Sequence, residues 1–181
     1  MTLRTANYFF RSQADEERMI EDGMPYLFQT DPEWAAEQYG DRTIEQTGCG
    51  PTSLAMALSS ILNQNFSPLE IASWSEQNGY YVDGAGSSWD LFTDYPAQFG
   101  IPVFQSGDIN ELTERLRQNA ILIFSMNPGD FTTSGHIITV KNIDEEGNVN
   151  VHDPNSEARS KKWSLNTLLG QAAAVFVLPG F

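Results

Sequence analysis

The sequence predicts an α+β fold, in which helices from the first part of the chain pack on a mostly antiparallel sheet formed by the last part. Apolar residues recur at helical spacing between residues 50 and 118, and helix-start signals precede them. After residue 119 the apolar residues come instead in short runs that are typical of strands. A length of 181 residues suits one domain with a single core.

The first two expected helices have clear start signals. Residues 51–62 form a buried helix with Pro51 in its first turn, where the missing N–H of proline costs nothing. Residues 67–78 begin with a capping box at Ser67 and end before Gly79.

Two further helices are expected before the strands. One covers residues 88–99, although Pro96 should bend it or end it early. The other follows Asp108 and runs to about residue 118, with paired charges along its surface.

Short apolar or alternating runs predict the strands of the sheet, and a Glu-Gly turn joins the middle two as a hairpin. The four strands are expected over residues 120–124, 137–140, 149–153 and 174–178.

The composition limits the partners that the protein can have. With a net charge of −14 and only ten Lys and Arg residues, the surface repels nucleic acid and anionic lipid. No apolar run reaches the roughly 18 residues of a membrane span, so the protein is expected to be soluble, either cytoplasmic or secreted with its leader removed. One Cys excludes an intramolecular disulfide, and two His leave too few ligands for the usual structural zinc. No metal or cofactor is therefore expected, and the oligomeric state stays open.

Residues 1–28 are expected to be an N-terminal extension or arm, and residues 29–181 the domain proper. The extension contains an aromatic patch and then a charged stretch over residues 15–18 that suits a short surface helix. A regulatory or propeptide-like role is the alternative.

Cys49 is a candidate nucleophile. It lies between Gly48 and Gly50, directly before the first buried helix, where unpaired N–H groups and the helix dipole favour a thiolate. The glycines let the backbone approach a substrate and leave the Cys49 amide free to bind an oxyanion. A small buried core residue is the alternative interpretation.

The two histidines differ in their places on the strands. His136 opens an apolar strand, so its ring should emerge at an edge of the sheet. His152 lies inside the partner strand beside Asp153, and adjacent strand residues point to opposite faces. Asp153 is therefore better placed to contact His136 on the neighbouring strand than to contact His152 beside it. A turn-capping Asp153 and a solvated His136 are the alternatives.

Cys49, His136 and Asp153 together provide the nucleophile, base and orienting group that thiol-based acyl transfer needs. The same interpretation gives a reason for a lone thiol in a chain with no disulfide or metal site.

Three sequence blocks, in this order, resemble the C39-like peptidase family and together cover roughly residues 29–178. They are residues 29–34 continuing through 39–44 to 48–56, residues 86–89, and residues 134–138 continuing through 144–156 to Trp163. The resemblance implies a papain-like cysteine proteinase fold, with Cys49, His136 and Asp153 in the triad positions.

The resemblance also implies that a Gln side chain helps the Cys49 amide in the oxyanion hole. Gln29 matches the family's motif, whereas Gln46 is nearer in sequence but lies where the family has no fixed residue. Thr43 occupies the position, about six residues before the Cys, where papain and the bacteriocin-leader peptidases carry this Gln. Either Gln could also be an ordinary surface amide.

The predicted function is that of a cysteine peptidase that hydrolyses the amide bonds of a peptide substrate through a thioester intermediate. One alternative keeps the fold and chemistry but acts on peptidoglycan as an amidase or endopeptidase, or transfers acyl groups to amines. The other is a catalytically silent binding domain.

Overall fold

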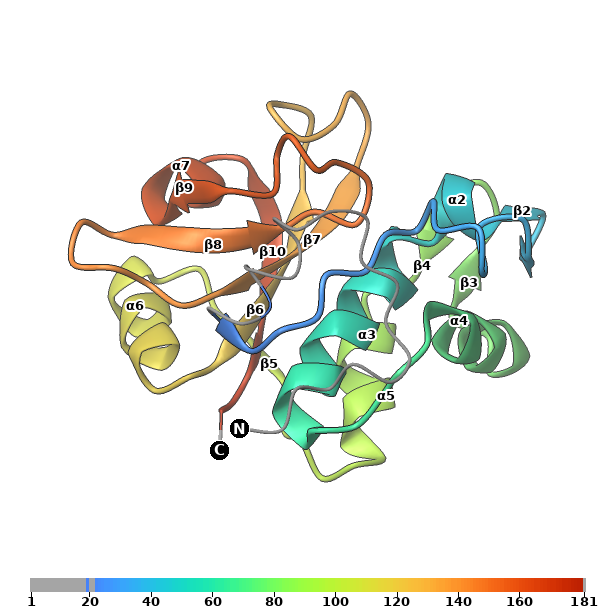
Figure 1. The fold of residues 1–181 in the computed structure, drawn as a ribbon, viewed down its shortest axis with the longest axis horizontal. Coiled ribbons are helices and arrows are strands. Elements are labelled where there is room, and N and C mark those ends of the chain that lie inside the picture. The colour runs from blue at the N-terminus through green and yellow to red at the C-terminus, as the bar shows by residue number, and fades with distance from the viewer. Residues whose placement is uncertain (1–18, 20–21, 181) are drawn as a thin grey trace.

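The computed structural model describes Met19 and residues 22–180 (Figure 1). The helix expected over residues 15–18, and most of the predicted extension 1–28, lie outside the described residues. The described chain confirms the predicted α+β class, with helices and a large antiparallel sheet.

One six-stranded sheet, counted within the described chain, forms the later part of the fold, and each of its neighbouring strand pairs is antiparallel. This arrangement confirms the predicted sheet. Across the sheet the order is β5 (Phe104–Gln105), β10 (Ala172–Leu178), β6 (Ile121–Met126), β7 (His136–Lys141), β8 (Asn148–His152) and β9 (Lys162–Ser164).

The four predicted helices are present, together with shorter elements that were not predicted. The helices are α3 (Cys49–Leu62), α4 (Pro68–Gln77), α5 (Leu91–Ala97) and α6 (Ile109–Arg117). The additional elements are the helices α2 (Ile44–Thr47) and α7 (Leu165–Leu169), the edge strands β5 and β9, and two small hairpins. These hairpins pair β1 (Gln38–Tyr39) with β2 (Arg42–Thr43), and β3 (Tyr81–Val82) with β4 (Gly86–Ser87).

The third helix is shorter than the predicted span of residues 88–99. At its start the N–H groups of residues 91–93 bond to carbonyls three residues back, and the first bond of α-helical spacing runs from Asp94 to Asp90. At its end, Pro96 has no N–H to donate, and Phe99 again bonds to a carbonyl three residues back. Tight turns therefore replace regular helix on both sides of α5.

Strand β6 separates two apolar clusters, because its side chains alternate between the two faces of the sheet. Ile121 and Ile123 pack in the cluster that contains α3, whereas Leu122 and Phe124 pack in the cluster that contains α6. Figure 1 shows α3 and α6 on opposite sides of the sheet. The sheet is therefore covered on both faces.

Helix α3 is attached to the sheet by two hydrogen bonds to β7. The Ser53 hydroxyl donates to the carbonyl of Ile137 over 3.2 Å, and the Thr139 hydroxyl donates to the carbonyl of Ser53 over 2.9 Å. All three residues are buried. This attachment places the start of α3 beside the start of β7.

The described residues just before Gln29 pack closely on the sheet. The carboxylate of Asp22 lies 2.7 Å from Nε2 of His152, and both side chains are buried. The Tyr26 ring stacks on the His152 ring with centroids 4.9 Å apart. The predicted domain boundary at residue 29 stays a prediction.

None of the helices among the described residues is both long enough and apolar enough to span a membrane.

Candidate active site

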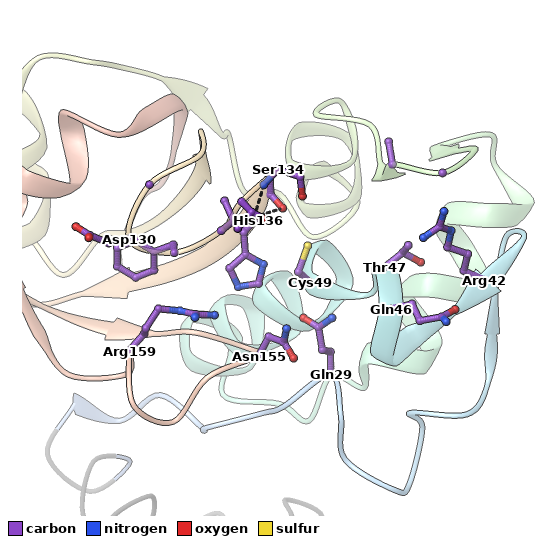
Figure 2. A pocket seen from close by; sticks show the side chains of 17 residues that line it. Gln29, Arg42, Gln46, Thr47, Cys49, Asp130, Ser134, His136, Asn155 and Arg159 are labelled. Atoms are coloured by element: carbon purple, nitrogen blue, oxygen red, sulfur yellow. Dashed lines mark hydrogen bonds between the residues drawn. The ribbon is translucent and has the colours of Figure 1, made fainter.

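A cleft of about 540 Å³ lies where the start of α3 meets the start of β7 (Figure 2). Its walls include Gln29, Gln46, Cys49 and His136, with Arg42 and Arg159. Figure 2 shows Cys49 near the middle of the cleft, with Arg159 and Arg42 on opposite sides of it.

Cys49 is the first residue of α3, which begins two positions earlier than the predicted start at residue 51. It is partly exposed to the cleft. The glycines on both sides are required by packing, since a Cβ at Gly48 would lie 2.5 Å from the carbonyl oxygen of Ile44 and one at Gly50 would lie 2.7 Å from Oγ of Ser87. The thiol is therefore held at the N-terminus of a helix whose first turn is tightly packed.

His136 is the first residue of β7, and its ring lies between Cys49 and Asp153. Its Nε2 is 2.7 Å from Oδ1 of Asp153, which leaves Nδ1 as the ring nitrogen available to Cys49. Burial alone would lower the pKa of His136, but the hydrogen bonds to Asp153 and Cys49 and their charges raise it from 6.5 to about 9. The ring therefore keeps its proton at neutral pH.

Asp153 follows β8 directly, although the sequence placed it within the strand, and its carboxylate is fully buried. Besides His136, the carboxylate accepts hydrogen bonds from the Asn155 N–H and from Nε of Arg159, each at 2.8 Å. Burial alone would raise the pKa of Asp153, but the hydrogen bond and charge of His136 and these two further donors hold it below its usual 3.8. The carboxylate therefore stays ionised in a buried position.

Gln29 is 2% exposed and joins both sides of the cleft. Its backbone N–H donates to the carbonyl of Pro154, and its Nε2 donates to the carbonyl of Glu45, both over 2.8 Å. No other described residue bonds to its Oε1. Figure 2 shows its amide group directed toward Cys49. One N–H of Nε2 is thus left for a ligand in the cleft.

Gln46 lies on the same cleft but is exposed, and its amide is used in a helix cap. Its Oε1 accepts the N–H of Thr43 over 3.1 Å at the start of α2.

The structure thus brings Cys49, His136, Asp153 and Gln29 together, whereas Gln46 caps a helix at the rim. Sequence reasoning missed Arg159 and Asn155, which bond to Asp153 and line the cleft. Asn155 lies within the third sequence block but was given no role there, and no motif marked Arg159, because the contacts of both residues depend on the loop that follows β8.

The described part of the chain contains no group of three His, Cys, Asp or Glu side chains able to hold a metal ion. What the cleft does hold is a thiol beside an imidazole that is hydrogen-bonded to a buried carboxylate, an arrangement that can generate a nucleophile and move a proton.

The sequence from residue 21 to residue 176 matches the model of the Peptidase_C39 like family. The chain belongs to this family. No curated protein matches the sequence.

Solved structures of C39 peptidases have the same fold, which confirms the expected papain-like architecture. A C39-like peptidase from Bacillus anthracis aligns with a TM-score of 0.58 and 15% identity, over 88% of this chain and 96% of that one. The peptidase domain of Streptococcus ComA, a bifunctional ABC transporter involved in quorum sensing, aligns with a TM-score of 0.55 and 16% identity, over 73% of this chain and 91% of that one. Membership of the Peptidase_C39 like family, together with this fold, supports a hydrolase of the cysteine-peptidase type.

Proposed function

We propose that this protein is a cysteine peptidase in which Cys49 is the nucleophile, His136 the acid and base, and Asp153 the group that orients the histidine. The observation that carries the proposal is the order of three side chains: the His136 ring lies on the cleft beside Cys49 and is hydrogen-bonded over 2.7 Å to a fully buried Asp153. The cleft is large enough for a peptide segment.

In the proposed first half-reaction, the Cys49 thiolate attacks the carbonyl carbon of an amide bond. The oxyanion accepts hydrogen bonds from the Cys49 N–H and from Nε2 of Gln29. When the C–N bond breaks, His136 gives its proton to the leaving amine, and a thioester remains on Cys49.

In the second half-reaction, water attacks the thioester carbonyl while His136 takes a proton from it. The thiolate leaves, and the carboxylic acid is released. Asp153 keeps Nδ1 of His136 turned toward the sulfur in both steps, because it binds the opposite ring nitrogen.

The test is a cleavage assay on a mixed peptide library and, in parallel, on peptidoglycan fragments, with products identified by mass spectrometry. We expect the wild-type protein to cleave peptides and Cys49→Ala to show no turnover. Full activity in Cys49→Ala would rule out the proposed nucleophile. Cleavage of wall fragments alone would keep the mechanism and move the substrate to peptidoglycan.

Alkylation separates an enzyme from a silent binding domain without any substrate. We expect iodoacetamide to modify Cys49 faster in the wild-type protein than in His136→Ala at pH 7, because the imidazolium stabilises the thiolate. Asp144→Ala is the matched control, since its carboxylate pairs with Lys162 and lies outside the cleft. Equal rates in wild type and His136→Ala would favour the binding domain.

A further inference from the structure

The charge of the cleft is opposite to that of the whole molecule. The chain carries 24 acidic and 10 basic residues, yet the cleft is lined by two arginines and a single acid, Asp130. The Asp130 carboxylate accepts a hydrogen bond from Nε2 of Gln171 over 2.7 Å, and Figure 2 shows it directed away from Cys49. Besides the buried Asp153, which pairs with Nε of Arg159, the cleft wall thus places no carboxylate beside the two arginines.

The proposed mechanism assigns a direction to the cleft. Because His136 must protonate the leaving amine, the amine part of the substrate lies on the imidazole side of the sulfur, and the acyl part lies on the other side. Figure 2 shows Arg159 on the imidazole side and Arg42 beyond Thr47 on the other. Arg159 thus borders the amine part of a bound substrate.

The guanidinium of Arg159 has a fixed orientation. Its Nε donates to Oδ2 of Asp153 over 2.8 Å, and the side chain is 31% exposed. No described residue accepts a hydrogen bond from either of its two Nη groups. A planar guanidinium held by Nε presents its Nη donors as a fork that suits a carboxylate. The exposed Asn155 lines the same cleft, and its backbone N–H bonds to the same Asp153 carboxylate over 2.8 Å.

We propose that Arg159 forms an anion subsite that binds a carboxylate on the amine side of the scissile bond. The inference rests on the proposed function, because that function sets the direction of the cleft. The carboxylate belongs either to an acidic side chain or to the C-terminus of a short amine product.

The test uses acyl transfer, which reports the amine side without knowledge of the natural substrate. N-acetylglycine p-nitrophenyl ester acylates Cys49 and releases p-nitrophenolate. An added amine attacks the thioester carbonyl, His136 takes a proton from the amine, the thiolate leaves and an amide forms; water yields the acid instead. The ratio of amide to acid product depends on amine binding and not on the acylation rate.

Three matched amines distinguish the two sources of the carboxylate. Gly-Glu-NH2 carries a carboxylate on its side chain, and Gly-Gln carries one at its free C-terminus. Gly-Gln-NH2 carries no carboxylate. We expect one of the two amines that carry a carboxylate to give an amide-to-acid product ratio about tenfold higher than that of Gly-Gln-NH2. Arg159→Gln should lose this preference. Arg117→Gln, which removes the same charge from the exposed end of α6, should keep it. A merely structural role for Arg159 would change the acylation rate and leave the preference intact.

Equal ratios for the three amines in the wild-type protein would overturn the subsite. Absence of p-nitrophenolate release would instead count against the proposed function. In that case the subsite is decided by the rate at which iodoacetate alkylates Cys49 relative to uncharged iodoacetamide. A lower relative rate in Arg159→Gln than in the wild type would support the subsite, and an unchanged rate would overturn it.

Discussion

The buried carboxylate of Asp153 lies 2.7 Å from Nε2 of His136, and this contact fixes both the orientation and the charge of the ring. The ring is held with Nδ1 toward Cys49, and its pKa is raised to about 9 despite burial that acts in the opposite direction. The acid–base behaviour of the cleft therefore depends on a residue that a substrate cannot reach.

Replacing Asp153 with Asn should keep the shape of the side chain and remove its charge. We expect kcat/KM to fall by about 100-fold or more, because the ring loses both its orientation and much of the charge that holds its proton. Asp144→Asn is the control, since its contact with Lys162 is an exposed ion pair. Steady-state kinetics of the two variants make the comparison, and a wild-type kcat/KM in Asp153→Asn would contradict the role of the carboxylate.

The protonation of His136 should be visible in its own titration. We expect its ring signal in NMR to titrate near pH 9 in the wild type, well above the usual 6.5, and at lower pH in Cys49→Ala, which lacks the thiolate. The His136→Gln spectrum identifies the signal. A wild-type titration at 6.5 or below would show that burial dominates over the two partners.

The same raised pKa predicts the direction of two pH dependences. A folded-state pKa above the unfolded value means that the protonated ring stabilises the fold fully below pH 6.5, and that this contribution is lost as the pH rises through about 9. The value of kcat/KM should fall over the same alkaline range, since the neutral ring cannot protonate the leaving amine. Urea unfolding midpoints and kinetics between pH 6 and pH 10 measure both, and His136→Gln should lack its share of the alkaline loss of stability.

The two glutamines of the cleft should respond differently to truncation. Gln29→Ala removes the proposed oxyanion donor and should lower kcat by about 100-fold. Gln46→Ala removes an exposed cap of α2 and should lower the free energy of unfolding by about 1 kcal/mol or less, with kcat retained. Kinetics and urea unfolding of both variants test the assignment. The reverse pattern would make Gln46 the oxyanion residue.

Gly86 supports the cleft from the hairpin of β3 and β4. Its φ is +97°, and a Cβ there would lie 2.9 Å from the carbonyl oxygen of Thr47, two residues before the thiol. Gly79 has a similar φ of +83° but no atom within 4 Å of a built Cβ. We expect Gly79→Ala to cost about 1 kcal/mol of unfolding free energy, and Gly86→Ala to cost more and to lower kcat as well. Equal losses of stability with unchanged kcat would show that the Thr47 contact is easily relieved.

The sequence was sufficient to predict the large elements, because each carries a local signal. The capping residue Ser67 and the proline after it mark the start of α4, and the apolar run of residues 120–124 marks β6. The two-residue strands of the hairpins are too short to show any periodicity. They exist because of contacts made far along the chain, such as that of the Tyr39 hydroxyl with Oγ of Ser87.

The candidate site was predictable to the extent that strand alternation applies. The sequence placed His152 and Asp153 on one strand with diverging side chains, and it therefore predicted a contact between Asp153 and His136. The structure has this contact, although Asp153 lies one residue beyond the end of β8. The partner of the other histidine did not follow, since Asp22 is 130 positions from His152. The contact of Arg159 with Asp153 was also not predictable from strand alternation, because a loop and not a strand brings the two residues together.

The hydrogen bonds that Ser53 makes with β7 join the element that carries the sulfur to the element that carries the imidazole. Proton transfer tolerates only small changes of distance, and a slip by one strand residue displaces a side chain by roughly 3.3 Å. Catalytic activity therefore depends on the contact between α3 and β7, and not on either element alone. Mild urea or pressure that weakens the contact between α3 and β7 should abolish catalytic activity, while the far-ultraviolet circular dichroism spectrum remains that of the native protein.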